Sequence, residues 1–140
     1  MRHRLAIPLL ALGLLAGCAP AAKSLGVDDA WARPAEAGST SAVYFRLQNG
    51  PQADMLIGVE SAAGRAMIHR TIHEADGIVR MEHQRQIDLP ANAQVVFEPG
   101  GLHIMLLDLA SDLAVGDSLE FRLLFKEHAP IDVQASVRQP

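Results

Sequence analysis

Short runs of strand length, each closed by turn-forming residues, limit what this chain can fold into more than any other feature. From Val27 onward, no long apolar pattern repeats with the period of a helix. Runs with alternating or β-branched residues are separated instead by Gly, Pro, Asn and Asp, which favour turns. The expected strands are 30–33, 42–48, 56–60, 66–72, 78–85, 94–98, 103–109, 118–125 and 131–138. About seven to nine such strands predict an all-β sandwich or barrel.

The first 17 residues are typical of a secretory signal peptide. Positive charges at Arg2 and Arg4 precede an apolar run, 5–17, that is too short to cross a bilayer, which needs about 20 residues. The run ends in the letters LAGC at positions 15–18, which resemble the bacterial lipobox. In a lipobox the Cys is acylated on its thiol and becomes the first residue after cleavage. We therefore expect Cys18 to be a lipid attachment point.

The next residues agree with a membrane-anchored protein of the bacterial envelope. Small and polar residues at 18–26 predict a flexible tether that leads to a single folded domain at 27–140. Because Ala19 rather than Asp follows Cys18, the resemblance to lipoproteins implies sorting to the outer membrane, with the domain facing the periplasm. The chain is long enough for one domain with a core and too short for two of ordinary size.

Composition disfavours several functions. Without Arg2 and Arg4, 10 of the 12 basic residues remain against 16 acidic ones, a net charge of −6 with His neutral. Such a charge disfavours nucleic acid and phosphate as partners. Cys18 is the only Cys, so its acylation leaves none for a disulfide framework, a thiolate metal site or a thiol nucleophile.

Pairs of His and Met spaced two residues apart recur in three of the expected strands. The pairs are Met67 and His69, Met81 and His83, and His103 and Met105. Residues i and i+2 of a strand point to the same side, so each pair presents an imidazole beside a thioether. The residues alone leave an alternative open, in which the Met side chains fill gaps in the core and the His side chains are solvated or bonded to the backbone.

The donor types favour one metal. Thioether sulfur is a soft, uncharged ligand, and together with imidazole it suits Cu(I), whereas Mg²⁺ and Ca²⁺ prefer carboxylate oxygens. Zinc seldom accepts Met. Thioethers also cannot be lost to disulfides in an oxidising envelope. The sequence therefore predicts copper, as Cu(I), as the bound ion.

The sequence resembles the periplasmic copper chaperone family PCuAC from about Ala30 to Val137. The ordered family pattern of His, Met and His-x-Met is matched by His69, Met81, His103 and Met105, with the family's 21 residues between Met81 and His103. Similarity also comes from the letters WARP at 31–34, from 44–49 and from PGGLHIM at 99–105. The resemblance implies a cupredoxin-like Greek-key β-sandwich and names these four residues as the copper ligands.

The match departs from the family pattern at the first ligand. Eleven residues separate His69 from Met81 where the usual pattern has ten, and His73 stands near where many members have Met. Either His69 or His73 is therefore the first ligand, and His83 is the other substitute to consider. His128 is expected to be a solvated loop residue.

The resemblance implies a metallochaperone, not an enzyme, that delivers Cu(I) to an apo-cuproprotein. In the family the recipient is usually the copper machinery of cytochrome c oxidase, including its binuclear copper centre or assembly factors. The alternatives are a structural or ligand-binding lipoprotein and a copper-dependent enzyme, for which Glu74, Asp76 and Glu82 are the nearest general bases. A blue-copper protein is disfavoured because that site needs a Cys thiolate, and Cys18 is committed to the anchor.

Overall fold

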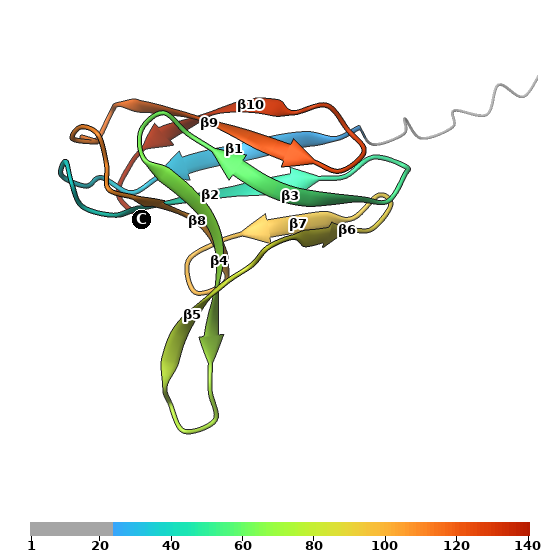
Figure 1. Cartoon of the computed structure of the whole chain (residues 1–140), viewed down its shortest axis with the longest axis horizontal. Helices are drawn as coiled ribbons and strands as arrows, with labels where there is room; N and C mark the ends of the chain where they lie inside the picture. The colour runs from blue at the N-terminus through green and yellow to red at the C-terminus, as the bar shows by residue number, and fades with distance from the viewer. Residues whose placement is uncertain (1–23) are drawn as a thin grey trace, which may run out of the picture.

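The computed structural model describes residues 24–140, all of it strand, turn or loop (Figure 1). The expected signal peptide at 1–17 and the expected acylation at Cys18 lie outside the described residues. Within the described part, no helix is long and apolar enough to cross a membrane. The strands are β1 Gly26–Ala32, β2 Ser41–Gln48, β3 Asp54–Glu60, β4 Arg65–His73, β5 Val79–His83, β6 Ile87–Leu89, β7 Gln94–Phe97, β8 Leu102–Leu107, β9 Ser118–Phe125 and β10 Ile131–Val137.

Each of the expected strands is present, and one short strand was missed. The expected strand at 78–85 is shorter, since β5 ends at His83. The chain then continues into β6, in which Ile87 and Leu89 are buried on either side of exposed Asp88. Three residues are too few to show a period in the sequence. The all-β prediction is confirmed, with ten strands in the described residues.

The strands form one sheet that curls over on itself. Their order is β5-β4-β8-β7-β2-β1-β10-β9-β3-β6, with a further pairing between β8 and β2. Strands that are distant in this order meet across the core. Phe45 on β2 lies with its ring centroid 5.5 Å from that of Phe121 on β9, although β1 and β10 separate the two strands in the sheet. The curl therefore encloses the core as a sandwich does.

Alternation along each strand divides the core from the outer surface. On β8, Leu102, Ile104 and Leu106 are buried and belong to the hydrophobic core. Burial of one such side chain contributes about 1.5 to 3 kcal/mol. Because successive strand residues face opposite sides, His103 and Met105 point away from this core. We call the side of β5, β4 and β8 opposite the core the outer face.

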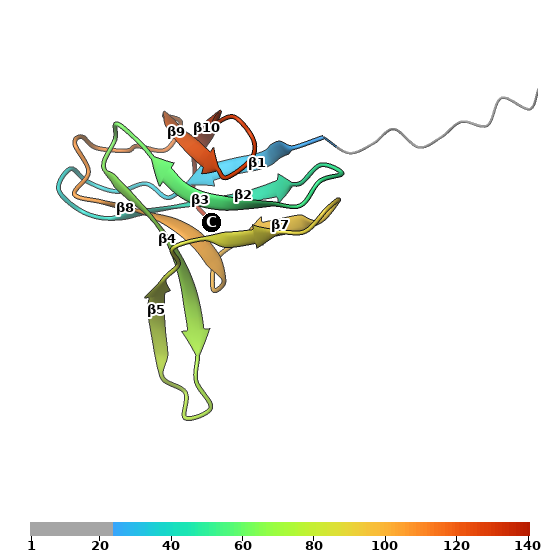
Figure 2. The same cartoon turned by 45° about the vertical axis from the view of Figure 1, so that its right-hand side comes forward.

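The β4–β5 hairpin extends away from the rest of the molecule (Figures 1 and 2). β5 is the last strand at one end of the sheet, it pairs only with β4, and all of its residues are exposed. The tip closes through a hydrogen bond from the Glu74 N–H to the Ile78 carbonyl. It also needs a left-handed residue, Gly77 at φ 83°, a conformation that favours glycine.

Candidate metal centre

Strand register brings the predicted ligands to the outer face. In the β4–β8 ladder, His69 lies opposite His103 and Met67 lies opposite Met105. In the β4–β5 ladder, His83 lies opposite His69, and Met81 lies opposite Thr71. Residues that are directly opposite share one face of a sheet. The imidazoles of β5, β4 and β8 therefore form one row across three strands.

His103 is oriented as a metal ligand would be. The side chain is only 4% exposed, and its Nδ1 donates a hydrogen bond to the Gly101 carbonyl over 3.1 Å. A carbonyl can only accept, so in the neutral ring this bond leaves a lone pair on Nε2. That Nε2 is buried and has no hydrogen-bond partner among the described residues. A buried acceptor without a partner is costly, and a metal ion would satisfy it.

His69 occupies the middle of the row. Its ring centroid lies 5.6 Å from that of His83 and 6.1 Å from that of His103. Its Nδ1 is likewise buried without a partner in the described part of the chain. Burial, followed by the charges that His103 and His83 can carry, lowers the pKa of His69 from its ordinary value. The lowered pKa favours the neutral imidazole, which is the form that binds metals.

The two predicted Met ligands share a groove with His103. Met81, His103 and Met105 all line it, as do Tyr44 and His73. Met105 is half-buried on β8, whereas Met81 on β5 is 58% exposed. His69 joins this group through its pairing with His103. The fold thus gathers the four residues on one face, and their role as ligands stays a prediction.

The alternative first ligand, His73, sits farther out on β4. It is exposed, and its Nε2 lies 3.3 Å from the Gly100 carbonyl, where it can donate a hydrogen bond. His69 instead faces His103 directly and has a free buried nitrogen. The geometry therefore favours His69 over His73 as the first ligand.

Residues 24–140 hold no group of three or more His, Cys, Asp or Glu side chains that could bind a metal ion. A metal at the His row must therefore use thioethers as well as imidazoles. Such a donor set suits soft Cu(I) and lacks the anionic oxygens that hard cations require.

One aromatic residue lines the groove and a second packs on it, in positions that the sequence analysis did not identify. Tyr44 lies beside His103, with ring centroids 6.4 Å apart, and Trp31 packs on Tyr44 at 4.6 Å. Burial raises the pKa of Tyr44, so its phenol stays neutral. Alternation along β2 could have identified Tyr44, because its neighbours Val43 and Phe45 both face the core.

The carboxylates considered as general bases are engaged at the hairpin. The Arg80 guanidinium forms ion pairs with Glu74 over 2.5 Å and with Glu82 over 3.3 Å. Asp76 accepts a hydrogen bond from the Ile78 N–H within the turn. None of the three is among the residues that line the groove.

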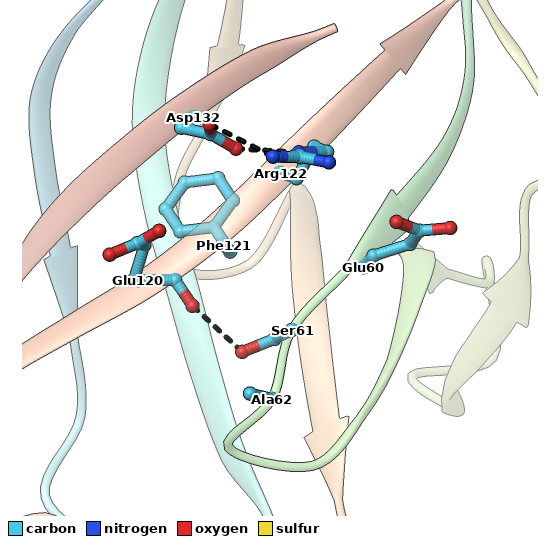
Figure 3. A pocket seen from close by; sticks show the side chains of 7 residues that line it. All are labelled: Glu60, Ser61, Ala62, Glu120, Phe121, Arg122 and Asp132. Carbon is cyan, nitrogen blue, oxygen red and sulfur yellow. Dashed lines mark hydrogen bonds and ion pairs between the residues drawn. The ribbon is translucent and has the colours of Figure 1, made fainter.

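A second pocket lies toward the other end of the sheet, and several of its polar groups are hydrogen-bonded to one another (Figure 3). Arg122 is bonded to Asp132 by two hydrogen bonds of 2.6 and 3.0 Å, and the Ser61 hydroxyl donates to the Glu120 carbonyl. Its cation is already paired with Asp132, and its other charged groups are the carboxylates of Glu60 and Glu120, so it lacks the soft donors of the His and Met groove.

His128 differs from its expected role as a solvated loop residue. Its Nδ1 lies 2.7 Å from a carboxylate oxygen of Asp54, whose side chain is fully buried. Burial alone would raise the pKa of Asp54, but hydrogen bonds from His128 and from the Met55 and Glu127 backbone outweigh it and lower that pKa to about 2. His128 therefore links the loop that follows β9 to the start of β3, and it is part of the scaffold.

Comparison with known proteins places the chain among lipoproteins. A family model described as lipoprotein LpqE-like matches residues 25–137. The protein RP573 of Rickettsia prowazekii is 32% identical over 128 residues, which cover 84% of this chain and 68% of RP573. The lipoprotein Lxx21020 of Leifsonia xyli is 27% identical over 118 residues, 84% of this chain and 71% of that protein.

Solved structures identify the fold. The copper-bound PCuAC domain of PmoF2 is 28% identical and superposes with a TM-score of 0.66, covering 85% of this chain and 98% of that domain. The apo PCuAC domain of PmoF1 is 26% identical with a TM-score of 0.69, covering 85% and 99%. The Cu(I) form of DR1885 from Deinococcus radiodurans is 25% identical with a TM-score of 0.62, covering 88% and 83%. The cupredoxin-like prediction is thereby confirmed.

Proposed function

This chain belongs to the LpqE-like family, with the fold of PCuAC domains, and from that premise we propose that it is a copper metallochaperone. It binds Cu(I) and passes it to an apo-cuproprotein. In this role it is a carrier, and the copper ion is its cargo. The copper-bound and Cu(I)-bound structures that it resembles support the proposal.

The observation that carries the proposal is the pair of facing imidazoles on β4 and β8. His69 and His103 each keep a buried ring nitrogen without a hydrogen-bond partner in the described residues. Met105 and Met81 supply thioethers from the same side of the sheet. We assign these four residues as the ligands of Cu(I).

The charge of the site favours the monovalent ion. Two imidazoles and two thioethers are all neutral, so bound Cu(I) keeps a single positive charge. A divalent ion would carry twice that charge with no carboxylate to compensate it. Cu(I) should therefore bind much more tightly than Zn²⁺.

Neutral ligands also allow the ion to leave. They can be replaced one at a time by a thiolate-bearing acceptor, beginning with the exposed Met81. The acceptor we propose is an apo-cuproprotein of the envelope, with the copper centre of cytochrome c oxidase or its assembly factors as the first candidates. Lipidation of Cys18 would hold the carrier at the outer membrane, facing the periplasm.

A competition titration tests the proposal. The full chain carrying Cys18→Ser, which removes the only thiol, is titrated with a Cu(I) chelator and separately with Zn²⁺. We expect one Cu(I) per chain and no effective competition from Zn²⁺. Absence of stoichiometric Cu(I) at micromolar protein would overturn the chaperone proposal and favour a structural lipoprotein.

A further inference from the structure

The outer face holds more soft donors than one Cu(I) ion uses. Four imidazoles and three thioethers project from β5, β4 and β8. They are His69, His73, His83, His103, Met67, Met81 and Met105. The proposed ligand set takes four of them and leaves Met67, His73 and His83 unassigned.

Met67 completes a second arrangement of four donors. It lies directly opposite Met105, as His69 lies directly opposite His103. Side chains that are directly opposite in a ladder have Cβ atoms about 4.5 to 5.5 Å apart. The two neighbouring strands β4 and β8 thus present two imidazoles and two thioethers as a square.

Met81 lies on β5, one strand farther from β8 and His103 than Met67 does. Its direct partner on β4 is Thr71, so His69 is a diagonal neighbour, and such neighbours lie about 7 to 8 Å apart. Met81 also belongs to the edge strand and is 58% exposed, whereas Met67 is half-buried on a strand that is paired on both sides. An incoming acceptor meets Met81 first.

We propose that Met67 is a further Cu(I) ligand, which forms with His69, His103 and Met105 an alternative set that retains the ion when Met81 is released. The inference rests on the proposed function. In the exchange, the bond from copper to the Met81 sulfur breaks and a bond from copper to the Met67 sulfur forms. Both thioethers are neutral and copper stays Cu(I), so no proton or electron moves.

The structure allows this exchange at little cost. The Met67 sulfur now lies 3.8 Å from an Arg65 guanidinium nitrogen, a contact with a weak acceptor. Arg65 is exposed and would be hydrated once the sulfur moves. The three rotatable bonds of Met give it the reach to turn toward His69.

His83 is a poorer candidate for retaining the ion. Its ring lies near His69, but it sits on β5, two residues from Met81. A displacement of the edge strand that removes Met81 would remove His83 with it. Met67 stays because its strand is also paired with β8.

Methyl-labelled methionine gives a direct test. The chain has five Met residues, so the full chain carrying Cys18→Ser and ¹³C-methyl Met gives five methyl signals, with Met1 and Met55 as internal controls. Cu(I) is added to this protein and to its Met81→Ala variant. We expect the Met81 and Met105 signals to move in the first protein, and the Met67 and Met105 signals to move in the second.

Affinity completes the test. Met81→Ala should keep Cu(I) binding, and adding Met67→Ala to it should cost a further loss of about tenfold or more, equivalent to about 1.4 kcal/mol. Adding Met55→Ala instead should change nothing. An unmoved Met67 signal in copper-loaded Met81→Ala, equal affinity of the single and double variants, or loss of all binding in Met81→Ala would each overturn the inference while leaving the chaperone proposal standing. No moving methyl in the parent protein would overturn both.

Discussion

The two strands that flank β4 hold their donors very differently. β8 lies inside the sheet, where it pairs with β4, β7 and β2, and its His103 is almost completely buried. β5 is the end of the sheet, pairs with β4 alone and exposes every residue. Under the proposed function, this difference divides the site, with donors that retain the ion on β8 and donors that release it on the edge strand β5.

The largest expected effect is a loss of Cu(I) affinity when a buried donor of β8 is removed. His103→Ala removes the proposed ligand whose free nitrogen is already aligned by Gly101. Loss of a residue that only hydrogen-bonds a metal ligand costs about 10- to 100-fold in metal affinity, so loss of this proposed ligand should exceed 100-fold. The measurement is a chelator competition with Cu(I), and Met55→Ala, a half-buried Met on β3, is the matched control. If His103→Ala bound Cu(I) with the affinity of the parent chain, β8 would not be the strand that holds the ion.

The next effect concerns the scaffold, where the loop after β9 is bonded to the start of β3. Asp54→Asn removes the buried carboxylate that accepts hydrogen bonds from His128 and the backbone. A carboxylate with a pKa of about 2 contributes about 2 to 3 kcal/mol at neutral pH, and the variant should lose that much in denaturant unfolding. Asp29→Asn, at an exposed ion pair, is the control. Equal unfolding midpoints for the two variants would contradict the assignment.

The same carboxylate predicts an acid limit. Its folded pKa lies below the unfolded value of about 3.9, so its contribution is fully present above pH 4 and is lost as the pH falls toward about 2. Unfolding free energy measured between pH 5 and pH 2 should therefore fall more steeply for the parent chain than for Asp54→Asn. If the unfolding free energies of the parent chain and Asp54→Asn fell equally steeply with pH, the assignment would be contradicted.

A smaller effect on Cu(I) affinity is expected from a change on the edge strand β5. Met81→Ala should weaken Cu(I) by about tenfold or less, because three ligands remain and Met67 can replace the fourth. It should also speed transfer to an acceptor chelator, since the step that frees the first ligand is gone. Stopped-flow transfer rates for the parent chain and Met81→Ala check this. A variant that binds normally yet transfers more slowly would reverse the roles given to the two strands.

The smallest effect on stability and on Cu(I) affinity is expected from removing a charge of the β4–β5 hairpin. Arg80→Ala breaks exposed ion pairs to Glu74 and Glu82, and ion pairs screened by solvent in this way contribute little to stability. Thermal unfolding and Cu(I) affinity should both stay close to the parent values. A large loss of affinity would mean that the hairpin is held rigidly and takes part in binding as firmly as β8 does.

Much of the fold was predictable because its signals are local. Alternating runs and turn residues give the strands, and the apolar residues that alternate along β8 and β9 fall on the core side. The short strand β6 was missed because three residues show no period. The hairpin's extension away from the body depends on which strands pair, and pairing between distant segments is set by the whole core.

The candidate site was partly predictable for the same reason. Spacing of two residues correctly put His69 with Met67, and His103 with Met105, on common faces. Register between strands, which no local pattern fixes, decides that His69 faces His103 while Met81 faces Thr71. The hydrogen bond that aligns His103 also depends on a backbone turn at Gly101.

X-ray absorption at the copper edge tests the central claim most directly. The full chain with Cys18→Ser is loaded with one equivalent of Cu(I), so that no thiol can supply the sulfur. The account predicts a monovalent copper edge and a first shell of imidazole nitrogen and thioether sulfur, with the nitrogen contribution reduced in His103→Ala. A shell without sulfur, or one that is unchanged in His103→Ala, would contradict it.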